Sequence, residues 1–394
     1  MPNPASLSLR EYFHAPAIAA GFAAVLIGYS GSAVIVFQAA KAAGADSLQI
    51  SSWMMVLGIG LGLTSIGLSW RYKMPIITAW STPGAALLAT SLGDIGMAEA
   101  IGAFLFSGAL ITLCGVSGWF ERIIDRIPLP LAAAMLAGIL FQFGVDAFTS
   151  MESQFGLVLA MFVVYLLARK LLPRYTILVV LVVGLVLCQF LDLLDFSDFS
   201  LAFNAPQFVV PEFSLAAMIG VGIPLFVVTM VSQNIPGIAV LRTAGYKAPV
   251  SSIIGWTGIT TLLLAPFGGF AYNLAAITAA ICTGPEAHAD ADKRYLAGLS
   301  TGVLYLLLGI FSGAIASLFA AFPGEFVFAL AGLALLSTIA NSLYTAVSDD
   351  ASREATVITF VVTASGLSLF GIGAAFWGLV AGVVASLVLS KKKS

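Results

Sequence analysis

Charged residues are scarce in this chain. Asp, Glu, Lys and Arg make up 9% of its 394 residues, whereas soluble globular domains carry about 25%. Hydrophobic residues make up 60% of the chain, which excludes an ordinary soluble domain and predicts a protein that crosses the lipid bilayer several times. The net charge of −2 provides no basic surface, so we expect no nucleic-acid partner.

Histidine and cysteine are also rare, and their placement argues against a catalytic site. The chain has two His and three Cys residues, with no HExxH motif and no CxxC spacing. We therefore expect no catalytic residues, no bound metal and no cofactor, so that an intramembrane enzyme is the least favoured function. Cys114, Cys188 and Cys282 lie in apolar stretches, where buried thiols and no disulfides are expected.

Apolar runs recur along the whole chain, and a membrane span needs about 20 such residues. The expected spans are residues 17–40, 51–69, 75–92, 98–119, 129–146, 153–168, 176–192, 214–235, 249–265, 266–283, 295–321, 326–346, 355–370 and 372–390. The fold class expected from this pattern is an all-α polytopic membrane protein with fourteen transmembrane segments.

The positions of Lys and Arg support this count. With strict alternation and a cytoplasmic N-terminus, sixteen of the 17 basic residues fall on the cytoplasmic side, and only Lys41 falls outside. This is the asymmetry that the positive-inside rule describes. The loss of one span would reverse every later loop, so we expect fourteen spans with both termini in the cytoplasm.

The third and tenth expected spans are interrupted in the same way. Residues 75–86 align with residues 266–277, and each segment opens with Pro, continues with poor helix formers, and then becomes Ala-rich. Thr82 and Asn273 stand where each short helix would begin, and both are good N-caps. Seven spans separate the two segments, which predicts two inverted repeats of seven spans. The alternative is a pair of ordinary kinked helices.

The two short helices predict an anion site. A helix N-terminus offers free N–H groups and roughly half a positive charge. No expected span has a central Lys or Arg. We therefore expect the helix starts after Thr82 and Asn273 to face each other near the bilayer midplane and to hold an anion.

A polar run ends the eighth expected span. Ser232, Gln233 and Asn234 are followed at once by Pro236 and Gly237. Pro removes a backbone donor, and polar groups at this depth persist only against protein or a water-lined cavity. A role in interhelical contacts is the alternative to a place in the transport site.

The run from Ser232 to Tyr246, SQNIPGIAVLRTAGY, resembles the signature of the BenE-type benzoate/proton symporters of bacteria. The resemblance extends over nearly the whole chain, through Gly28–Gly31, Thr82–Gly84 and Tyr272–Asn273. More distantly, the layout is similar to that of the nucleobase permeases and the sulfate-type anion exchangers, which are built as two inverted repeats of seven spans.

This resemblance implies a transporter of the bacterial inner membrane that imports benzoate, or a similar aromatic carboxylate, together with protons. It also implies that a core domain, residues 1–127 and 214–322, moves against a gate domain, residues 128–213 and 323–394. Whether the protein forms a homodimer stays open. The family fold brings spans 1, 3, 8 and 10 around the cargo. The candidate binding residues are Tyr29, Ser30, Gly31, Ser81, Thr82, Gln233, Asn234, Phe270, Tyr272 and Asn273.

The chain departs from the nucleobase permeases in its acidic residues. Those permeases carry acids on spans 8 and 10 at positions that look like Gln233 and Tyr272 here. The proton therefore travels either on the benzoate or through a boundary acid such as Glu99, Asp146 or Glu325. The missing acids favour one alternative, an uncoupled small organic anion carrier or channel of the same fold. A second alternative is a transporter of another small anion or of a nucleobase-like substrate.

Overall fold

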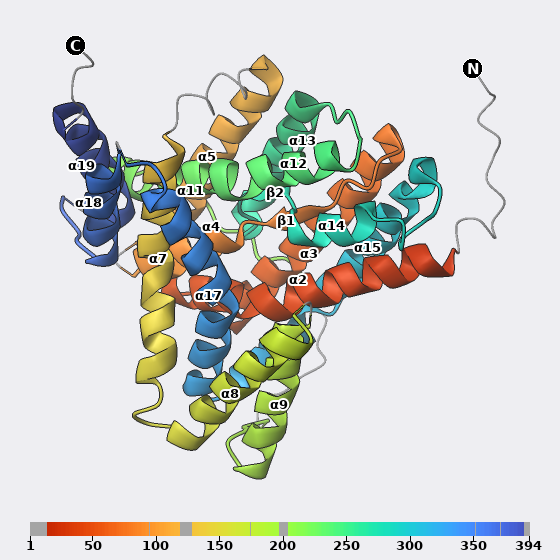
Figure 1. The fold of residues 1–394 in the computed structure, drawn as a ribbon, viewed down its shortest axis with the longest axis horizontal. Helices are drawn as coiled ribbons and strands as arrows, with labels where there is room; N and C mark the ends of the chain where they lie inside the picture. Colours follow the sequence, from red (N-terminus) through yellow and green to blue (C-terminus); the bar gives the residue numbers. More distant parts are fainter. Residues whose placement is uncertain are drawn as a thin grey trace.

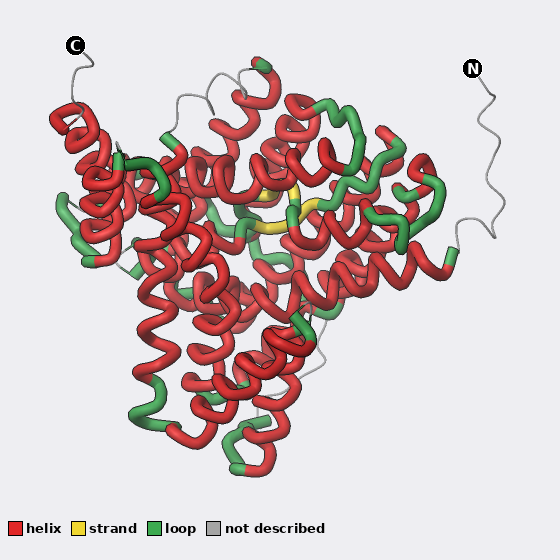
Figure 2. Tube along the Cα trace, viewed as in Figure 1, coloured by secondary structure: helices red, strands yellow, loops and turns green. Residues whose placement is uncertain are grey.

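A computed structural model describes residues 14–93, 95–118, 128–173, 175–196, 204–350, 352–370 and 372–389. Helices dominate it, and a small pair of strands lies near the centre (Figures 1 and 2). In chain order the described elements are α2 (Ala15–Ala42), α3 (Ser47–Tyr72), β1 (Thr78–Trp80), α4 (Thr82–Ser91), α5 (Met97–Ser117), α7 (Leu129–Thr149), α8 (Phe155–Leu171), α9 (Thr176–Phe190), α10 (Leu215–Ala217), η1 (Met218–Gly222), α11 (Ile223–Thr229), η2 (Met230–Asn234), α12 (Ile235–Thr243), α13 (Val250–Leu264), η3 (Ala265–Phe267), β2 (Tyr272–Leu274), α14 (Ile277–Thr283), η4 (Ala291–Lys293), α15 (Tyr295–Ile310), α16 (Ser312–Ala320), α17 (Gly324–Val347), α18 (Arg353–Ala364) and α19 (Ala374–Leu389).

Several of these helices are long and apolar enough to cross a membrane. Within the described residues six stretches qualify, namely α3, α5, α7, α17 and the composite stretches Leu215–Arg242 and Val250–Phe267. Two bent pairs raise the number to eight: α2, bent by 41° between Tyr29 and Ser32, and the stretch from η4 through α16, bent by 64°. The expectation of a mainly helical, polytopic membrane protein is confirmed.

Two π-helical turns interrupt the stretch Leu215–Arg242. Each turn, η1 and η2, is followed directly by a helix with Pro in its first turn, Pro224 in α11 and Pro236 in α12. Pro inside a helix removes an N–H donor and clashes with the carbonyl four residues earlier. A π turn widens the helix just before each Pro, so the helix continues past the Pro. Such π turns are frequent at functional sites.

The molecule is not entirely α-helical, which corrects the all-α expectation. β1 and β2 pair antiparallel, with Thr78 opposite Leu274, Ala79 opposite Asn273 and Trp80 opposite Tyr272. The yellow strands of Figure 2 lie among the surrounding helices. Backbone that leaves the helical conformation inside a membrane protein still needs hydrogen-bond partners. The two interrupted segments supply those partners to each other.

Glycines permit close contacts between helices that are distant in sequence. A Cβ on Gly58 of α3 would lie 2.6 Å from the Cα of Gly309 in α15. A side chain on Gly115 of α5 would likewise collide with the backbone of Gly255 in α13. Small residues allow such close approach in membranes, where dispersion contacts contribute much of the helix association. The helix pairs α3–α15 and α5–α13 thereby frame the central strands.

Candidate functional site

The first half of the site is the junction of β1 and α4. Helix α4 starts at Thr82, and its N-cap is Ser81, whose Oγ accepts a hydrogen bond from the Gly84 N–H at 3.0 Å. The expectation that Thr82 is the cap is therefore wrong by one residue. The cap requires an extended backbone, which Ser81 adopts with φ −75° and ψ 98°. Pro83 follows in the first turn, where its missing N–H is harmless.

The second half corrects the role expected for Asn273. This residue lies in β2, fully buried, and its Nδ2 donates to the Ala271 carbonyl at 2.8 Å. Helix α14 begins only at Ile277, and its N-cap, Ala276, supplies no side-chain cap. Asn273 pairs with Ala79 in the strand and lies four residues before α14 begins, too early in the chain to be the N-cap of that helix.

The two interrupted segments match in a register different from that of the sequence alignment. β1 and β2 begin at residues 78 and 272, and α4 and α14 begin at residues 82 and 277. Equivalent positions are therefore 194 or 195 residues apart, against 191 in the alignment that matched Pro75 with Pro266. The turns that precede the strands keep this spacing, because Lys73 after α3 and Gly268 after η3 lie 195 residues apart and both adopt positive φ, +53° and +96°. Pro75 and Pro266 are therefore not equivalent positions.

A cavity of about 800 Å³ opens beside this junction. Its size falls within the range of about 300–1,000 Å³ that is typical of small-molecule sites. One wall comes from α2, β1, α4, η2, α14 and α15, and the opposite wall from α7, α8, α9 and α17. Apolar side chains such as Ile27, Leu136 and Ile281 make up much of the lining. The polar and charged lining residues are Ser32, Thr82, Tyr165, Arg169, Thr176, Ser232, Gln233, Thr278, Tyr305, Ser337, Thr338, Asn341, Ser342 and Thr345.

The uncapped start of α14 faces this cavity. Ala275, Ala276, Ile277 and Thr278 all line it. The first turn of a helix has N–H groups without intrahelical partners, which attract anions. Thr278 lines the cavity, and its hydroxyl is buried without a hydrogen-bond partner. At α4, by contrast, the Ser81 hydroxyl satisfies the Gly84 N–H, and Pro83 has no N–H. The start of α14 therefore keeps more N–H groups without a side-chain cap.

The predicted site residues divide into two groups. Thr82 and Gln233 line the cavity. Tyr29, Ser81, Asn234, Phe270, Tyr272 and Asn273 do not line it. The surroundings of Ser30 and Gly31 lie outside what the structure describes.

Most of the second group supports the cavity from behind. The Asn234 Oδ1 accepts from the Leu274 N–H at 3.0 Å and so ties β2 to η2. The Tyr272 hydroxyl donates to the Val56 carbonyl at 2.7 Å. Phe270 is fully buried, with its ring centroid 5.8 Å from that of Trp53. These three side chains hold the non-helical backbone in place, a task that the sequence patterns did not separate from ligand contact.

Tyr29 takes an intermediate position. Its ring meets the Trp80 ring edge-on, with centroids 5.1 Å apart, and its hydroxyl is buried without a partner. The Trp80 Nε1 donates to the Ser32 Oγ at 3.0 Å, and the Ser32 Oγ donates to the Gly28 carbonyl at 2.6 Å. This chain of contacts connects β1 to α2 at the edge of the cavity.

Sequence reasoning missed several cavity residues. Ser337, Thr338, Asn341, Ser342 and Thr345 share one face of α17 and line the cavity. Their spacing matches the helical period, so the stripe was readable within an otherwise apolar span. No sequence pattern indicated Arg169, Thr278 or Tyr305, because only tertiary packing places these residues beside the cavity. Arg169 is the sole charged residue among the described residues that line the cavity.

Comparisons with known proteins agree with the resemblance seen in the sequence. Residues 11–388 match the family described as BenE, benzoate membrane transport protein. The chain is 49% identical over 375 residues to the inner membrane protein YdcO of Escherichia coli, covering 95% of this chain and 96% of that protein. It is 40% identical over 387 residues to the benzoate membrane transport protein of Acinetobacter baylyi, covering 98% of each.

Solved structures show the same fold at low sequence identity. The transmembrane domain of the cyanobacterial bicarbonate transporter BicA matches with a TM-score of 0.58 at 14% identity, covering 98% of each chain. The anion transporter SLC26A9 matches with a TM-score of 0.62 at 13% identity, covering 97% of this chain and 66% of that one. The family match over nearly the full length decides the assignment: this chain belongs to the benzoate membrane transport protein family, and it is a membrane transporter and not an enzyme.

Proposed function

We propose that this protein is a secondary transporter of the bacterial inner membrane that imports benzoate, or a similar aromatic carboxylate, with protons by alternating access. The observation that carries the proposal is the cavity beside the interrupted segments. It combines apolar walls, which suit an aromatic ring, with the uncapped start of α14 and the unpartnered Thr278 hydroxyl, which suit a carboxylate.

Two energies indicate how the cargo is held. Burial of one face of a benzoate ring, on the order of 100 Å², contributes roughly 2–3 kcal/mol. Removal of the carboxylate from water costs several kcal/mol unless the charge is hydrogen-bonded. The ring alone therefore cannot retain the anion. The N–H groups of the first turn of α14, with Thr278, Thr82 and Gln233, are the donors that offset this cost.

Helix contacts support fourteen spans in two inverted repeats. If α3, α5, α13 and α15 are spans 2, 4, 9 and 11, then α3 packs on α15 and α5 packs on α13. An inverted repeat with seven spans per half maps the first of these pairs onto the second. It also maps β1 onto β2, and α7 onto α17, and these elements pair with each other as well.

The cavity lies between the proposed core and gate domains. Core residues 1–127 and 214–322 contribute α2, α4, η2, α14 and α15, and gate residues 128–213 and 323–394 contribute α7, α8, α9 and α17. Arg169 and Thr345 line the cavity near the ends of α8 and α17, which the distribution of basic residues assigns to the cytoplasm. On this assignment the structure represents an inward-facing state, with both termini cytoplasmic.

Uptake of labelled benzoate into proteoliposomes, with and without an imposed pH gradient, tests the proposal. Protein-free liposomes measure the passive entry of benzoic acid. We expect protein-dependent uptake that unlabelled benzoate inhibits and that an inward proton gradient accelerates. Uptake no faster than in protein-free liposomes would contradict the proposal.

One observation favours a second candidate, an uncoupled carrier of the same fold. No acidic residue is found among the described residues that line the cavity. The same assay distinguishes the two functions, because an uncoupled carrier would equilibrate benzoate without responding to the pH gradient beyond the passive control. Competition by bicarbonate or by a nucleobase would identify another cargo.

A further inference from the structure

A second chamber lies on the other side of α4. It has a volume of about 380 Å³ and is lined by the end of α4, by α7, by the end of α18 and by the start of α19. Its polar side chains include Thr90, Ser91, Gln142, Asp146, Thr363 and Ser368. None of the binding residues expected from the sequence lines it, whereas Asp146, one of the boundary acids considered for the proton, does. The chamber is therefore distinct from the cavity described above.

Both α4 and α7 line the two compartments, at different points along their lengths. On α4, Thr82 and Pro83 face the large cavity, and Ala89, Thr90 and Ser91 face the second chamber. Pro83 and Ala89 are six positions apart in α4, which corresponds to about 9 Å along a helix. On α7 the change occurs between Leu136 and Gly138. The two compartments are therefore neighbours along one path between core and gate.

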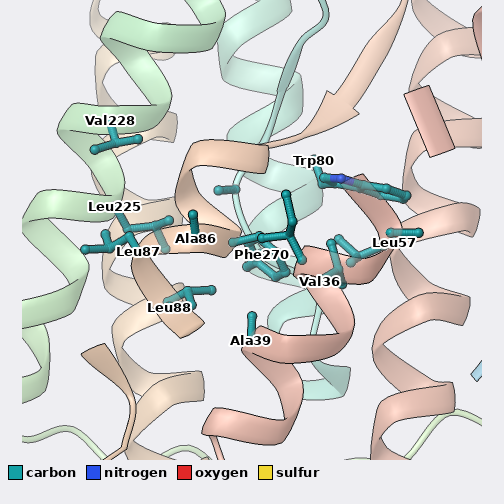
Figure 3. Close-up of a cluster of buried hydrophobic side chains, with 14 of the residues drawn as sticks. Val36, Ala39, Leu57, Trp80, Ala86, Leu87, Leu88, Leu225, Val228 and Phe270 are labelled. Atoms are coloured by element: carbon teal, nitrogen blue, oxygen red, sulfur yellow. The ribbon is translucent and has the colours of Figure 1, made fainter. Parts of the chain in front are cut away.

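The residues of α4 between the two compartments are apolar and buried, and we call them the seal. Ala85, Ala86, Leu87 and Leu88 of α4 are fully buried, and Leu225 of α11 is fully buried beside them. Figure 3 shows Ala86, Leu87 and Leu88 beside Leu225 and Val228. A charged carboxylate cannot pass such a layer without a large desolvation cost, whereas a neutral aromatic acid can do so far more easily.

The second chamber has a single titratable side chain among its described lining residues, Asp146. Its Oδ1 accepts a hydrogen bond from the Gln142 Nε2 at 2.7 Å. Thr363 also lines the chamber, and its hydroxyl is buried without a partner against Gly378 of α19. The lining parts of α4, α18 and α19 contribute no charged group. Glu152, in the turn after α7, and Glu325, in the first turn of α17, do not line the chamber, and residue 94 lies outside the described residues.

A carboxylate that enters this chamber meets the carboxylate of Asp146. Two like charges at close range disfavour each other, and one proton shared with the pair removes the repulsion. The geometry therefore links proton binding to cargo binding without an acid in the large cavity.

We propose that the second chamber is the loading site for the aromatic carboxylate on the far side of the seal, and that Asp146 is its proton donor. The proton moves from an Asp146 carboxyl oxygen to a carboxylate oxygen of the cargo. Asp146 is left ionised, and the neutral acid passes the apolar seal as core and gate move. Asp146 then takes up the next proton from the adjoining solution. This inference rests on the proposed transport of a carboxylate.

Transport by the reconstituted full-length protein tests the role of Asp146. Asp146→Asn removes the proton site, Asp146→Glu retains a carboxyl group, and Glu152→Gln is the control, an exposed acid nearby that does not line the chamber. Each variant is assayed for uptake of labelled benzoate driven by a pH gradient and for benzoate counterflow at equal pH. We expect Asp146→Asn to lose both the stimulation by the gradient and counterflow several-fold, because the cargo then stays charged at the seal. Asp146→Glu should restore part of both activities, and Glu152→Gln should resemble the parent. Normal gradient stimulation or normal counterflow in Asp146→Asn would overturn the proposal, as would an equal loss in Asp146→Asn and Asp146→Glu.

A second measurement separates failure of this inference from failure of the proposed function. Ser368→Cys places a thiol in the chamber at an exposed position. Labelling of this thiol by a membrane-impermeant maleimide should be slowed by benzoate, more strongly at low pH than at high pH. This pH dependence should disappear when Asp146→Asn is added. If the parent fails to transport benzoate, the proposed function is wrong. If the parent transports benzoate but protection is absent or unaffected by Asp146→Asn, the chamber proposal alone is wrong.

Discussion

At the scale of single residues, Gly28 shows how closely the walls of the large cavity approach each other. A Cβ on this residue would lie 3.1 Å from the Thr278 Cγ2 and 3.2 Å from the Tyr305 hydroxyl. Its carbonyl accepts from the Ser32 Oγ, which in turn accepts from the Trp80 indole. Gly28 therefore brings α2, α14 and α15 together at the place where the carboxylate is proposed to bind. A larger residue would have to displace the two hydroxyl-bearing side chains.

We predict that Gly28→Ala weakens benzoate binding. The added methyl group requires Thr278 and Tyr305 to shift by a few tenths of an ångström. A loss of binding free energy of about 1.4 kcal/mol would raise KM about tenfold. Gly67→Ala is the matched control, because a Cβ there meets nothing within 4 Å. Initial rates of benzoate uptake over a range of concentrations measure the effect. An unchanged KM in Gly28→Ala would show that this wall of the cavity does not touch the cargo.

At the scale of elements, the interrupted segments are held by side chains from neighbouring helices. Ser65 and Ser69 of α3 accept hydrogen bonds from the N–H groups of Thr78 and Ile76, at 3.1 Å each. Asn234 of η2 does the same for Leu274 in β2. The strands themselves are only three residues long, so these side chains supply much of their support. The short sheet beside the cavity is thus held by side chains of α3 on the β1 side and of η2 on the β2 side.

We predict that Asn234→Ala destabilises the protein. The substitution leaves the buried Leu274 N–H without its acceptor, at a cost of about 1–3 kcal/mol. The apparent melting temperature in detergent should fall by a few degrees, as measured by intrinsic fluorescence. Asn341→Ala serves as the control, since Asn341 is exposed to the cavity, and its melting temperature should stay near that of the parent. Equal melting temperatures for both variants would show that Asn234 is not needed to hold β2.

At the scale of the whole molecule, the two compartments lie at the boundary between the same two groups of helices. The large cavity and the second chamber both have walls from α4 of the proposed core and α7 of the proposed gate. If these two groups of helices move against each other, one compartment can open as the other closes, which is the movement that alternating access describes.

We predict that Gly93 and Lys247 lie on opposite sides of the membrane. Both are exposed, and the proposed topology places residue 93 outside and residue 247 in the cytoplasm. Gly93→Cys should react with an impermeant maleimide in intact cells, whereas Lys247→Cys should react only after permeabilisation. The native Cys114, Cys188 and Cys282 are buried, so background labelling should be low. Reaction of both variants from the same side would refute the topology.

The sequence by itself determined the class of the protein and the approximate location of its site. Few charges over 394 residues leave only a membrane protein, and the paired prolines, Pro75 and Pro266, mark two interrupted spans because Pro cannot continue an α-helix. The polar run at Gln233 indicated a part of the transport site, and Gln233 lines the cavity. These features depend on composition and on local backbone chemistry, and both can be read directly from the sequence.

Only the tertiary structure decided which side chains face the cavity. Ser81 and not Thr82 caps α4, because the backbone angles at the strand end select the cap. Asn273 lies in a strand because Ala79, 194 residues earlier, pairs with it. Thr278 and Tyr305 come to the cavity through the packing of α14 and α15 on α2. Pairing and packing join residues that are far apart in the chain, and no local pattern contains that information.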